Sequence, residues 1–202
     1  MIETVKNAWK IPELRKQLVF VPFAIVVFRF GHAIYVPFVD TASLATQFAT
    51  ISGGNLLGYF NTLSGGGLAT ASIFALSIYP YINSSIIIQL LQVAIPALER
   101  LAKDGGEEGK KKLQRITRYT TLALAIIMAF SYYLMLKSFG TVLTRTGTWS
   151  AIVIIASFVA GSMVVMWLGD QITEKGIGNG ISIILLVGIV SSGFSALTSI
   201  IS

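Results

Sequence analysis

Residues 77–91 read SIYPYINSSIIIQLL, a stretch whose isoleucines and leucines suit a membrane-spanning helix. The same stretch carries the amides of Asn83 and Gln89, each of which needs several hydrogen-bond partners when it leaves water. Ile78 and Ile82 are four residues apart, so they share one face of a helix, while the polar residues lie around the same turns. This stretch predicts a helix that meets lipid on one side and a more polar neighbour on another.

Helix packing alone would explain the serines of this stretch. Ser84 and Ser85 are small and hydroxylated, and such residues let transmembrane helices approach closely and form hydrogen bonds. Packing explains Asn83 and Gln89 less well, so a functional face stays open as the alternative.

The composition places the chain in a membrane. Of its 202 residues, 54% are hydrophobic and 12% are charged, and the mean hydropathy is +0.76. These values lie outside the usual range of soluble domains. The net charge of +6 does not indicate nucleic-acid binding, because the basic residues form short clusters between apolar runs. The chain has no cysteine, which excludes disulfides and thiolate metal sites.

Five apolar runs are long enough to cross a bilayer, which takes roughly 20 helical residues. We therefore expect an all-α membrane protein with five transmembrane helices. The predicted spans are residues 18–37, 79–95, 119–136, 149–168 and 181–201. The other predicted segments are a cytoplasmic N-terminus at 1–17, an outer loop at 38–78, and cytoplasmic loops at 96–118 and 169–180. Pro96 is expected to end the second span, because the residue before a proline is pushed out of the helical region.

The distribution of Lys and Arg predicts the orientation, since cytoplasmic segments are enriched in both. One set of alternate segments holds Lys6, Lys10, Arg15, Lys16, Arg100, Lys103, Lys110, Lys111, Lys112, Arg115, Arg118 and Lys175. The opposite side holds only Lys137 and Arg145. The N-terminus is therefore predicted to be cytoplasmic and the C-terminus outside.

The predicted outer loop contains GGNLLGYFNTLSGGG at residues 53–67, a short apolar piece between glycines. Pro80 suits the first turn of a helix, because its missing N–H has no intrahelical partner to lose. We therefore start the second span near Tyr79 and expect the preceding part to enter the membrane and return. Such non-helical backbone requires cover from protein or a water-filled cavity. The alternative is one long tilted helix with a kink at Pro80.

The remaining polar residues support structural roles. Arg29 lies within the first predicted span, where we expect it to satisfy carbonyls or an acidic partner, and we place His32 near the outer surface. Asn179 is expected to cap the helix that begins at Gly180. No span carries paired acids or a base beside a nucleophile, so we predict neither an enzyme nor a cofactor or metal site.

Four stretches closely resemble the SecY family, the central subunits of the bacterial protein-conducting channel. They are FRFG at residues 28–31, LLGYFNTLSGGGLATASIFALSIYPYINSSIIIQLL at 56–91, TRYTT at 117–121 and GDQITEKGIGNGISIILL at 169–186. The resemblance covers essentially the whole chain in order. It implies the first half of a pseudo-symmetric ten-helix channel, with an hourglass pore between the two halves.

The resemblance also implies roles for individual residues. A short plug helix on the outer side corresponds to about residues 56–66, with the apolar side chains Leu56, Leu57, Tyr59, Phe60 and Leu63. An apolar pore ring includes Ile78, Ile82, Ile181 and Leu185. A lateral gate toward lipid includes Asn83, Ile86 and Gln89. An apolar constriction resists wetting and limits ion leak without favouring particular polypeptide sequences.

By the same resemblance, the expected function is protein translocation across, and membrane-protein insertion into, the bacterial cytoplasmic membrane. The implied partners are small subunits of the SecE and SecG types, the SecA motor, the ribosome, signal peptides and nascent chains, and the C-terminal half of the channel. The lipid bilayer surrounds the assembly. This half would supply the plug, half of the pore ring and one wall of the lateral gate, and alone it cannot close a channel.

Three positions depart from the family pattern. The end of the first span usually reads IPIPG and here reads IYVPF at residues 34–38, Ser77 stands where glycine is common, and Asp170 stands where glutamate is common. Two other functions stay open. The chain could be a truncated multispan protein that is itself insertion cargo, or half of a secondary transporter with broken helices near the midplane.

Overall fold

The computed structural model describes residues 11–51, 56–103 and 105–201, without the side chains of Leu56 and of residues 194–201. The described residues form eight helices. They are α2 (Pro12–His32), α3 (Thr41–Ile51), α4 (Leu56–Leu63), α5 (Tyr79–Ala94), α6 (Pro96–Lys103), α7 (Gly106–Ser138), α8 (Thr148–Lys175) and α9 (Gly180–Ile201). Within these ranges β pairing is confined to two isolated bridges, Tyr35 with Ser72 and Val39 with Leu143. The chain is therefore all-α, as predicted.

Two helices, α7 and α8, are each long and apolar enough to cross a membrane. The helices α5 and α6 together are also long and apolar enough to form a third span. They are bent by 103° relative to each other. A further apolar helix covers the described residues Gly180–Gly193. These helices confirm a membrane protein by length and composition, and the number of five spans stays a prediction.

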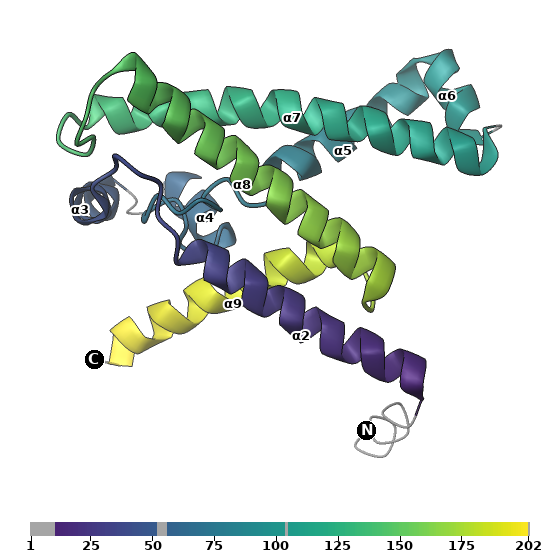
Figure 1. Cartoon of the computed structure of the whole chain (residues 1–202), viewed down its shortest axis with the longest axis horizontal. Coiled ribbons are helices and arrows are strands. Elements are labelled where there is room, and N and C mark those ends of the chain that lie inside the picture. The colour runs from purple at the N-terminus through teal and green to yellow at the C-terminus, as the bar shows by residue number, and fades with distance from the viewer. Residues whose placement is uncertain (1–10, 52–55, 104, 202) are drawn as a thin grey trace.

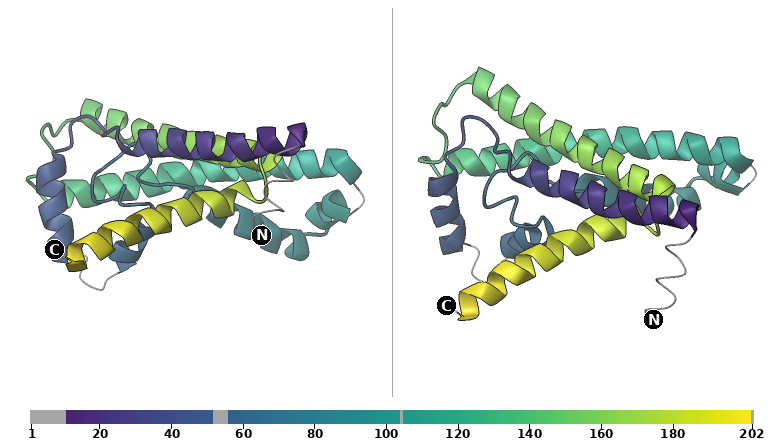
Figure 2. Two further views of the ribbon diagram at one scale, coloured as in Figure 1. Left: turned by 90° about the horizontal axis from the view of Figure 1, so that it is seen from below. Right: turned by 60° about the horizontal axis from the view of Figure 1, so that its bottom comes forward.

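The helix α8 runs through the middle of the molecule (Figure 1). It packs against α7 on one side and against α2 and α9 on the other, while α7 also contacts α5 and α6. Figure 2 shows that α2, α7, α8 and α9 run roughly lengthwise, with α3 standing across them at one end. The central position of α8 lets it contribute to both apolar cores.

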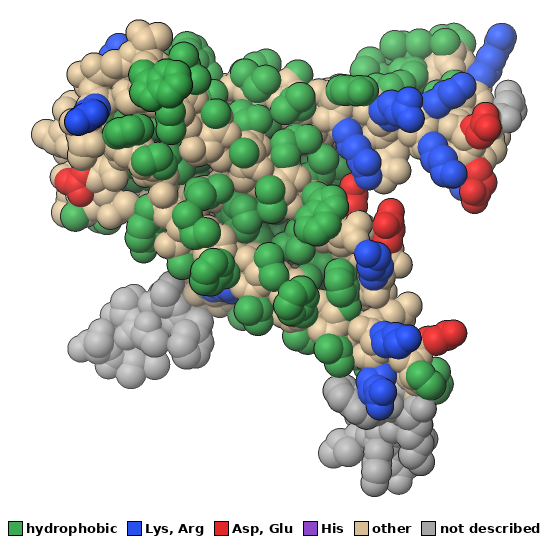
Figure 3. Space-filling view, in the orientation of Figure 1, with side chains coloured by type: hydrophobic (Ala, Val, Ile, Leu, Met, Phe, Trp, Pro, Cys, Tyr) green, Lys and Arg blue, Asp and Glu red, His purple; other side chains and the backbone are tan. Residues whose placement is uncertain are grey.

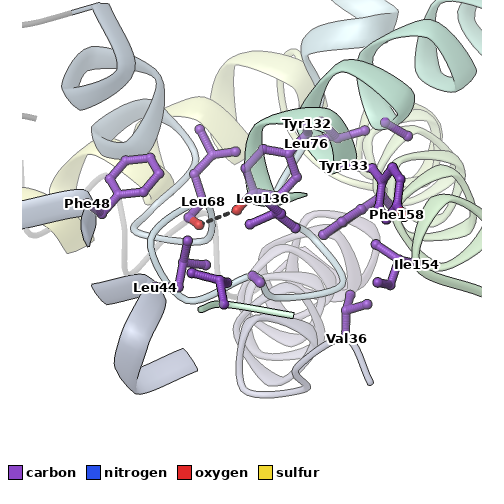
Figure 4. Packing of buried hydrophobic residues seen from close by; sticks show 14 residues of the cluster. Val36, Leu44, Phe48, Leu68, Leu76, Tyr132, Tyr133, Leu136, Ile154 and Phe158 are labelled. Carbon is purple, nitrogen blue, oxygen red and sulfur yellow. Dashed lines mark hydrogen bonds between the residues drawn. The ribbon is translucent and has the colours of Figure 1, made fainter. Parts of the chain in front are cut away.

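The first core lies where α7 and α8 meet the non-helical residues 64–78 and α3 (Figure 4). Its fully buried members include Leu44 from α3, Leu136 from α7 and Phe158 from α8. The hydroxyl of Tyr132 donates a hydrogen bond to the Leu68 carbonyl, which pairs one backbone group of the non-helical segment. The segment is thus covered by protein, the condition that a polar backbone at membrane depth requires.

The second core joins α2, α5, α8 and α9. Its buried members are Ala24, Phe28, Phe74, Ile78, Val165, Leu168, Ile172 and Ile184. Ile73 packs against both cores. Its carbonyl oxygen lies so close to α8 that a Cβ added at Gly161 would be 1.9 Å away. Glycine at this position therefore sets how closely α8 can approach the non-helical segment.

The predicted break before α5 is confirmed. Residues 64–78 form turns, α5 begins at Tyr79, and Pro80 occupies its first turn. The alternative of one long helix with a kink at Pro80 is therefore wrong. At the other end α5 stops at Ala94, and Ile95 is extended at φ −113° just before Pro96, as expected.

Two of the departures from the family pattern fall on unusual backbone conformations. Phe38, the last residue of IYVPF, has φ +67°, and Ser77 has φ +48°. Side chains with a Cβ are disfavoured in this left-handed region by about 1–2 kcal/mol, whereas glycine is not. The two residues therefore hold strain where a glycine would hold none.

Replacing Ser77 with glycine is expected to raise the free energy of unfolding by about 0.5–1 kcal/mol. The relief of left-handed strain exceeds the added entropy of the unfolded chain, which is about 0.4–1 kcal/mol. Thermal unfolding of the purified protein would measure the change. Ser85→Gly is the matched control, because residue 85 lies inside α5 and glycine there should cost about 0.5–1 kcal/mol. Destabilisation by both variants would contradict the strain at Ser77.

The polar connection predicted at residues 96–118 is largely helical. It contains α6 and the first turns of α7, separated near Gly105. The helix α7 begins at Gly106, well before the predicted start at Tyr119, because a buried face recurs every four residues at Gly109, Leu113 and Thr117. A search for apolar runs alone does not detect this amphipathic extension.

Three other boundaries differ for related reasons. The helix α2 begins at Pro12 rather than at residue 18, with proline in its first turn. The helix α8 continues to Lys175, so most of the loop predicted at 169–180 is helical. Asn179 caps α9 as predicted, since its Oδ1 accepts a hydrogen bond of 3.0 Å from the Ile181 N–H. The predicted N-terminal segment lies outside the described residues up to position 10.

The helix α3 lies inside the predicted outer loop and was not expected. Asp40 precedes it, accepting hydrogen bonds from the Ala42 N–H at 3.1 Å and from the Ser43 hydroxyl at 2.5 Å. The Ser43 hydroxyl holds the pKa of Asp40 below its ordinary value, since the bond favours the charged carboxylate. The stability that this hydrogen bond contributes is fully present above the ordinary carboxyl pKa. It is lost as the pH falls through the lowered pKa of Asp40.

Candidate functional site

The four residues predicted for the pore ring lie together. Ile78 precedes α5, Ile82 lies in its first turns, and both belong to or pack against the second core. Ile181 and Leu185 pack against the same core from α9. The structure thus brings together residues that are about a hundred positions apart in the sequence.

The four ring residues are not equally accessible. Ile78 is 1% exposed, and it packs against α8, where a Cβ at Gly169 would lie 3.2 Å from its Cδ1. Ile82, Ile181 and Leu185 are half-buried. Among the described side chains of α9, the buried apolar one is Ile184, which the sequence did not single out. Ile82, Ile181 and Leu185 therefore keep part of their side chains accessible, whereas Ile78 does not.

The residues predicted for the lateral gate share an exposed face of α5. Asn83, Ile86 and Gln89 recur every three residues, and all three are exposed. The Gln89 amide donates to the Ser85 hydroxyl at 3.2 Å within the same helix. No other described segment covers this face, which leaves it free for lipid or a further helix.

The opposite face of α5 packs against α7. Its buried residues are Pro80, Ser84 and Ile88. The Ser84 hydroxyl donates a hydrogen bond of 2.8 Å to the Thr117 carbonyl. Ser84 therefore serves helix packing, which is the role that packing alone predicted for the serines.

The predicted plug residues form the short helix α4. Leu57 and Leu63 are half-buried, Tyr59 and Phe60 are exposed, and the side chain of Leu56 lies outside the described part. The Phe60 ring meets the Tyr79 ring edge-on with centroids 5.3 Å apart. Between α4, residues 68–79 and α7 lies an apolar cavity of about 300 Å³. No side chain of α4 that the structure describes is fully buried, so burial holds this helix only loosely.

Two side chains from other helices bind the end of α4. His32 of α2 donates from Nε2 to the Ser64 carbonyl at 2.7 Å, and Ser192 of α9 donates to the Thr62 carbonyl at 2.9 Å. A Cβ at Gly188 would lie 2.6 Å from the Leu63 carbonyl oxygen, so α9 approaches α4 directly. Nothing local in the sequence predicts these contacts, which join residues 32 and 130 positions apart.

Charged side chains gather toward one end of the molecule. Figure 3 shows Lys and Arg around the first turns of α7, the last turn of α8 and the start of α2, with few at the opposite end. Arg118 of α7 pairs with Asp170 of α8 at 2.8 Å. The Asp170 side chain is 12% exposed and that of Arg118 47%, so the carboxylate is the member that depends more on its partner.

Arg29 has no hydrogen bond or ion pair among the described residues, so the carbonyl or acidic partner expected for it is not found there. His32 is half-buried and bound to α4 rather than simply facing the outer surface. The described part of the chain contains no group of three His, Cys, Asp or Glu side chains that could hold a metal ion.

Comparison with known proteins places these features in a family. Residues 72–202 match the SecY family model. The chain is 44% identical over 191 residues to the protein translocase subunit SecY of Rickettsia conorii, covering 93% of this chain and 44% of that protein. It is 46% identical over 183 residues to the protein of the same name from Escherichia coli K12, covering 89% and 41%. The chain thus spans less than half the length of these relatives.

Solved structures show the same fold. One described as the structure of a protein conducting channel aligns with a TM-score of 0.59 at 16% identity, covering 91% of this chain and 40% of that one. Sec61 in the canine ribosome-channel complex from the endoplasmic reticulum aligns with a TM-score of 0.58 at 16% identity, with the same coverage.

Proposed function

Because this chain belongs to the SecY family, we propose that it forms the N-terminal half of a protein-conducting channel in a bacterial cytoplasmic membrane. It would translocate polypeptides across the membrane and release apolar segments into the bilayer. The names of the relatives, which describe protein translocase subunits, support this function. So do the folds of the two channel structures.

In this proposal the chain contributes five spans, with the N-terminus in the cytoplasm. The first span lies in α2, the second in α5, and the others in α7, α8 and α9. The charge asymmetry supports this orientation, since the Arg118 end carries most of the basic residues. Spans corresponding to the part of the relatives outside the matched region would close the pore and provide the second wall of the lateral gate.

The observation that carries the proposal is one apolar cluster against α8, to which the start of α5 and the start of α9 both contribute. Ile78 is a buried member of this cluster, and Ile82, Ile181 and Leu185 pack against it. An apolar constriction of this kind resists wetting and gives a passing polypeptide no specific hydrogen bonds. It would form half of the pore ring, with α4 as the plug on its outer side. The exposed face at Asn83, Ile86 and Gln89 would face the lateral gate.

The proposed partners follow from the same assignment. The sealed channel would include SecE- and SecG-type small subunits, and a SecA motor or a ribosome would deliver signal peptides and nascent chains. The ribosome is the partner with independent support, because one structure of the same fold is a ribosome-channel complex. No cofactor is proposed.

Photo-crosslinking tests the pore assignment. A probe placed at Ile82 or Ile181 in the assembled channel is expected to crosslink a stalled translocating polypeptide at least about 10-fold more than a probe at Ile127. Ile127 is 61% exposed on α7, where it would face lipid in this proposal. A probe at Gln89 should crosslink signal peptides preferentially. Equal crosslinking at Ile82, Ile181 and Ile127 in an active channel would contradict the pore assignment.

A further inference from the structure

Two side chains of other helices donate hydrogen bonds to the end of α4, and both donors have a second acceptor nearby. Ser192 donates to the Thr62 carbonyl at 2.9 Å, and the Gly188 carbonyl of its own helix lies 3.2 Å away. His32 has Nε2 at 2.7 Å from the Ser64 carbonyl and Nδ1 at 3.1 Å from the Phe28 carbonyl. In each case the alternative acceptor is the carbonyl four residues earlier in the donor's own helix.

A neutral imidazole carries one N–H, so His32 donates to only one of these carbonyls at a time. The 2.7 Å contact corresponds to the tautomer with the proton on Nε2. If α4 moved away, the proton could relocate to Nδ1 and the ring would donate to Phe28. Ser192 could likewise turn its hydroxyl to Gly188. Neither donor would be left unsatisfied in the membrane, which removes the main cost of breaking a buried hydrogen bond.

These contacts act on a helix that buries few side chains, although Asn61 accepts a hydrogen bond of 2.9 Å from the Ala69 N–H and the Phe60 ring meets that of Tyr79. The described side chains of α4 are half-buried or exposed, and a helix with few buried contacts opens at low cost. The His32 ring packs edge-on against the stacked rings of Phe28 and Phe74, with centroid distances of 4.5 and 5.8 Å. The His32 ring, which donates a hydrogen bond to the end of α4, therefore helps to determine the position of that helix.

We propose that His32 and Ser192 form a reversible two-point latch that holds α4 in its resting position through the Ser64 and Thr62 carbonyls. This inference rests on the proposed function, in which α4 plugs a channel. The latch sets the fraction of resting channels in which the plug is displaced. When a substrate displaces α4, His32 and Ser192 donate instead to carbonyls of their own helices. When α4 returns, they donate to the Ser64 and Thr62 carbonyls again.

Ion leak through resting channels measures the fraction of channels in which α4 is displaced. The assembled full-length channel is reconstituted into liposomes, and potassium efflux is recorded without substrate, alongside translocation of a precursor and the melting temperature. His32→Ala and Ser192→Ala are each expected to raise resting efflux at least about 2-fold but less than about 10-fold, because the bond that each donor forms in its own helix offsets part of the one lost to α4. Translocation should change little in both variants, and so should the melting temperature of Ser192→Ala, which separates a latch from a general role in folding. His32→Ala also loses the ring contacts with Phe28 and Phe74, so its melting temperature is expected to fall.

Two further variants make the test specific. His32→Gln keeps an N–H donor and should return the efflux toward the wild-type value. Ser191→Ala removes the neighbouring hydroxyl, about 100° around α9, and should leave the efflux unchanged. If the two contacts act independently, the double variant His32→Ala with Ser192→Ala should multiply the two single effects.

The possible failures are distinguishable. Wild-type efflux in both alanine variants and in their double variant, with normal translocation, would overturn the latch and leave the proposed function intact. An assembled wild-type protein that translocates no precursor would overturn the proposed function itself. If His32→Ala does not assemble, the comparison of His32→Gln with Ser192→Ala still tests the latch, since only the serine variant should leak.

Discussion

Replacing Gly161 with valine is expected to lower the free energy of unfolding by at least about 3 kcal/mol and to prevent stable folding. A Cβ at this position would lie 1.9 Å from the carbonyl oxygen of Ile73 and 2.7 Å from its carbonyl carbon. Overpacking a core typically costs about 1–3 kcal/mol when side chains can move aside. Here the obstacle is backbone, so α8 itself would have to shift and both apolar cores would open.

Thermal unfolding and protease resistance of the purified protein would measure this loss. Gly193→Ala is the matched control, because an added Cβ there meets nothing within 4 Å. It should be neutral, or stabilise α9 by up to about 1 kcal/mol through helix propensity. Similar melting temperatures for Gly161→Val and Gly193→Ala would show that α8 does not approach residue 73 as closely as described.

Replacing Arg118 with methionine is expected to cost about 1–3 kcal/mol. The change leaves the Asp170 carboxylate, 12% exposed, without the partner that donates to it at 2.8 Å. Hydrogen bonds to charged groups contribute about 1.5–3 kcal/mol, and a lost partner leaves a desolvated charge behind. The exposure of Arg118 at 47% keeps the expected cost below that of a fully buried pair.

Unfolding experiments at neutral pH would compare this variant with two others. Asp170→Asn removes the charge together with the need for a partner, so it should cost less than Arg118→Met. Glu99→Gln breaks the exposed ion pair with Lys103 in α6 and should cost no more than about 0.5 kcal/mol. A loss in Arg118→Met no larger than in Glu99→Gln would contradict the importance of the α7–α8 pair.

Much of the fold follows from patterns within single segments. The break before Tyr79 was predictable because Pro80 and the glycine-bounded piece before it both disfavour one continuous helix. The cap at Asn179 was predictable from the polar residue that precedes an apolar run. The early start of α7 was not predicted, because the first half of that helix is rich in Lys and Glu and its buried face includes glycine and threonine.

The helix α3 shows what the search for spans leaves out. Leu44 and Phe48 are buried and four residues apart, and Asp40 stands where a capping residue belongs. This pattern was available in the sequence, but an 11-residue helix is too short to appear among membrane spans.

The candidate site was predictable only in part. The ring and gate residues came from resemblance and helical spacing, and their roles remain predictions, although the structure brings the ring residues together. The contacts of His32 and Ser192 with α4 could not be predicted from the sequence, because each joins a side chain to a backbone carbonyl of another element. A carbonyl has the same chemistry in every residue, so no residue type marks it as an acceptor.

The close contact between Gly161 and residue 73 has a consequence for synthesis. The two positions are separated by about 90 residues, which a ribosome adds in roughly 5–20 s. During that interval residues 64–78 have already been made, while the helix that covers them has not. Their backbone groups must therefore stay hydrated, or be shielded by another protein, until α8 emerges. The order of the helices along the chain thus makes residues 64–78 wait for a helix made much later before their backbone is covered.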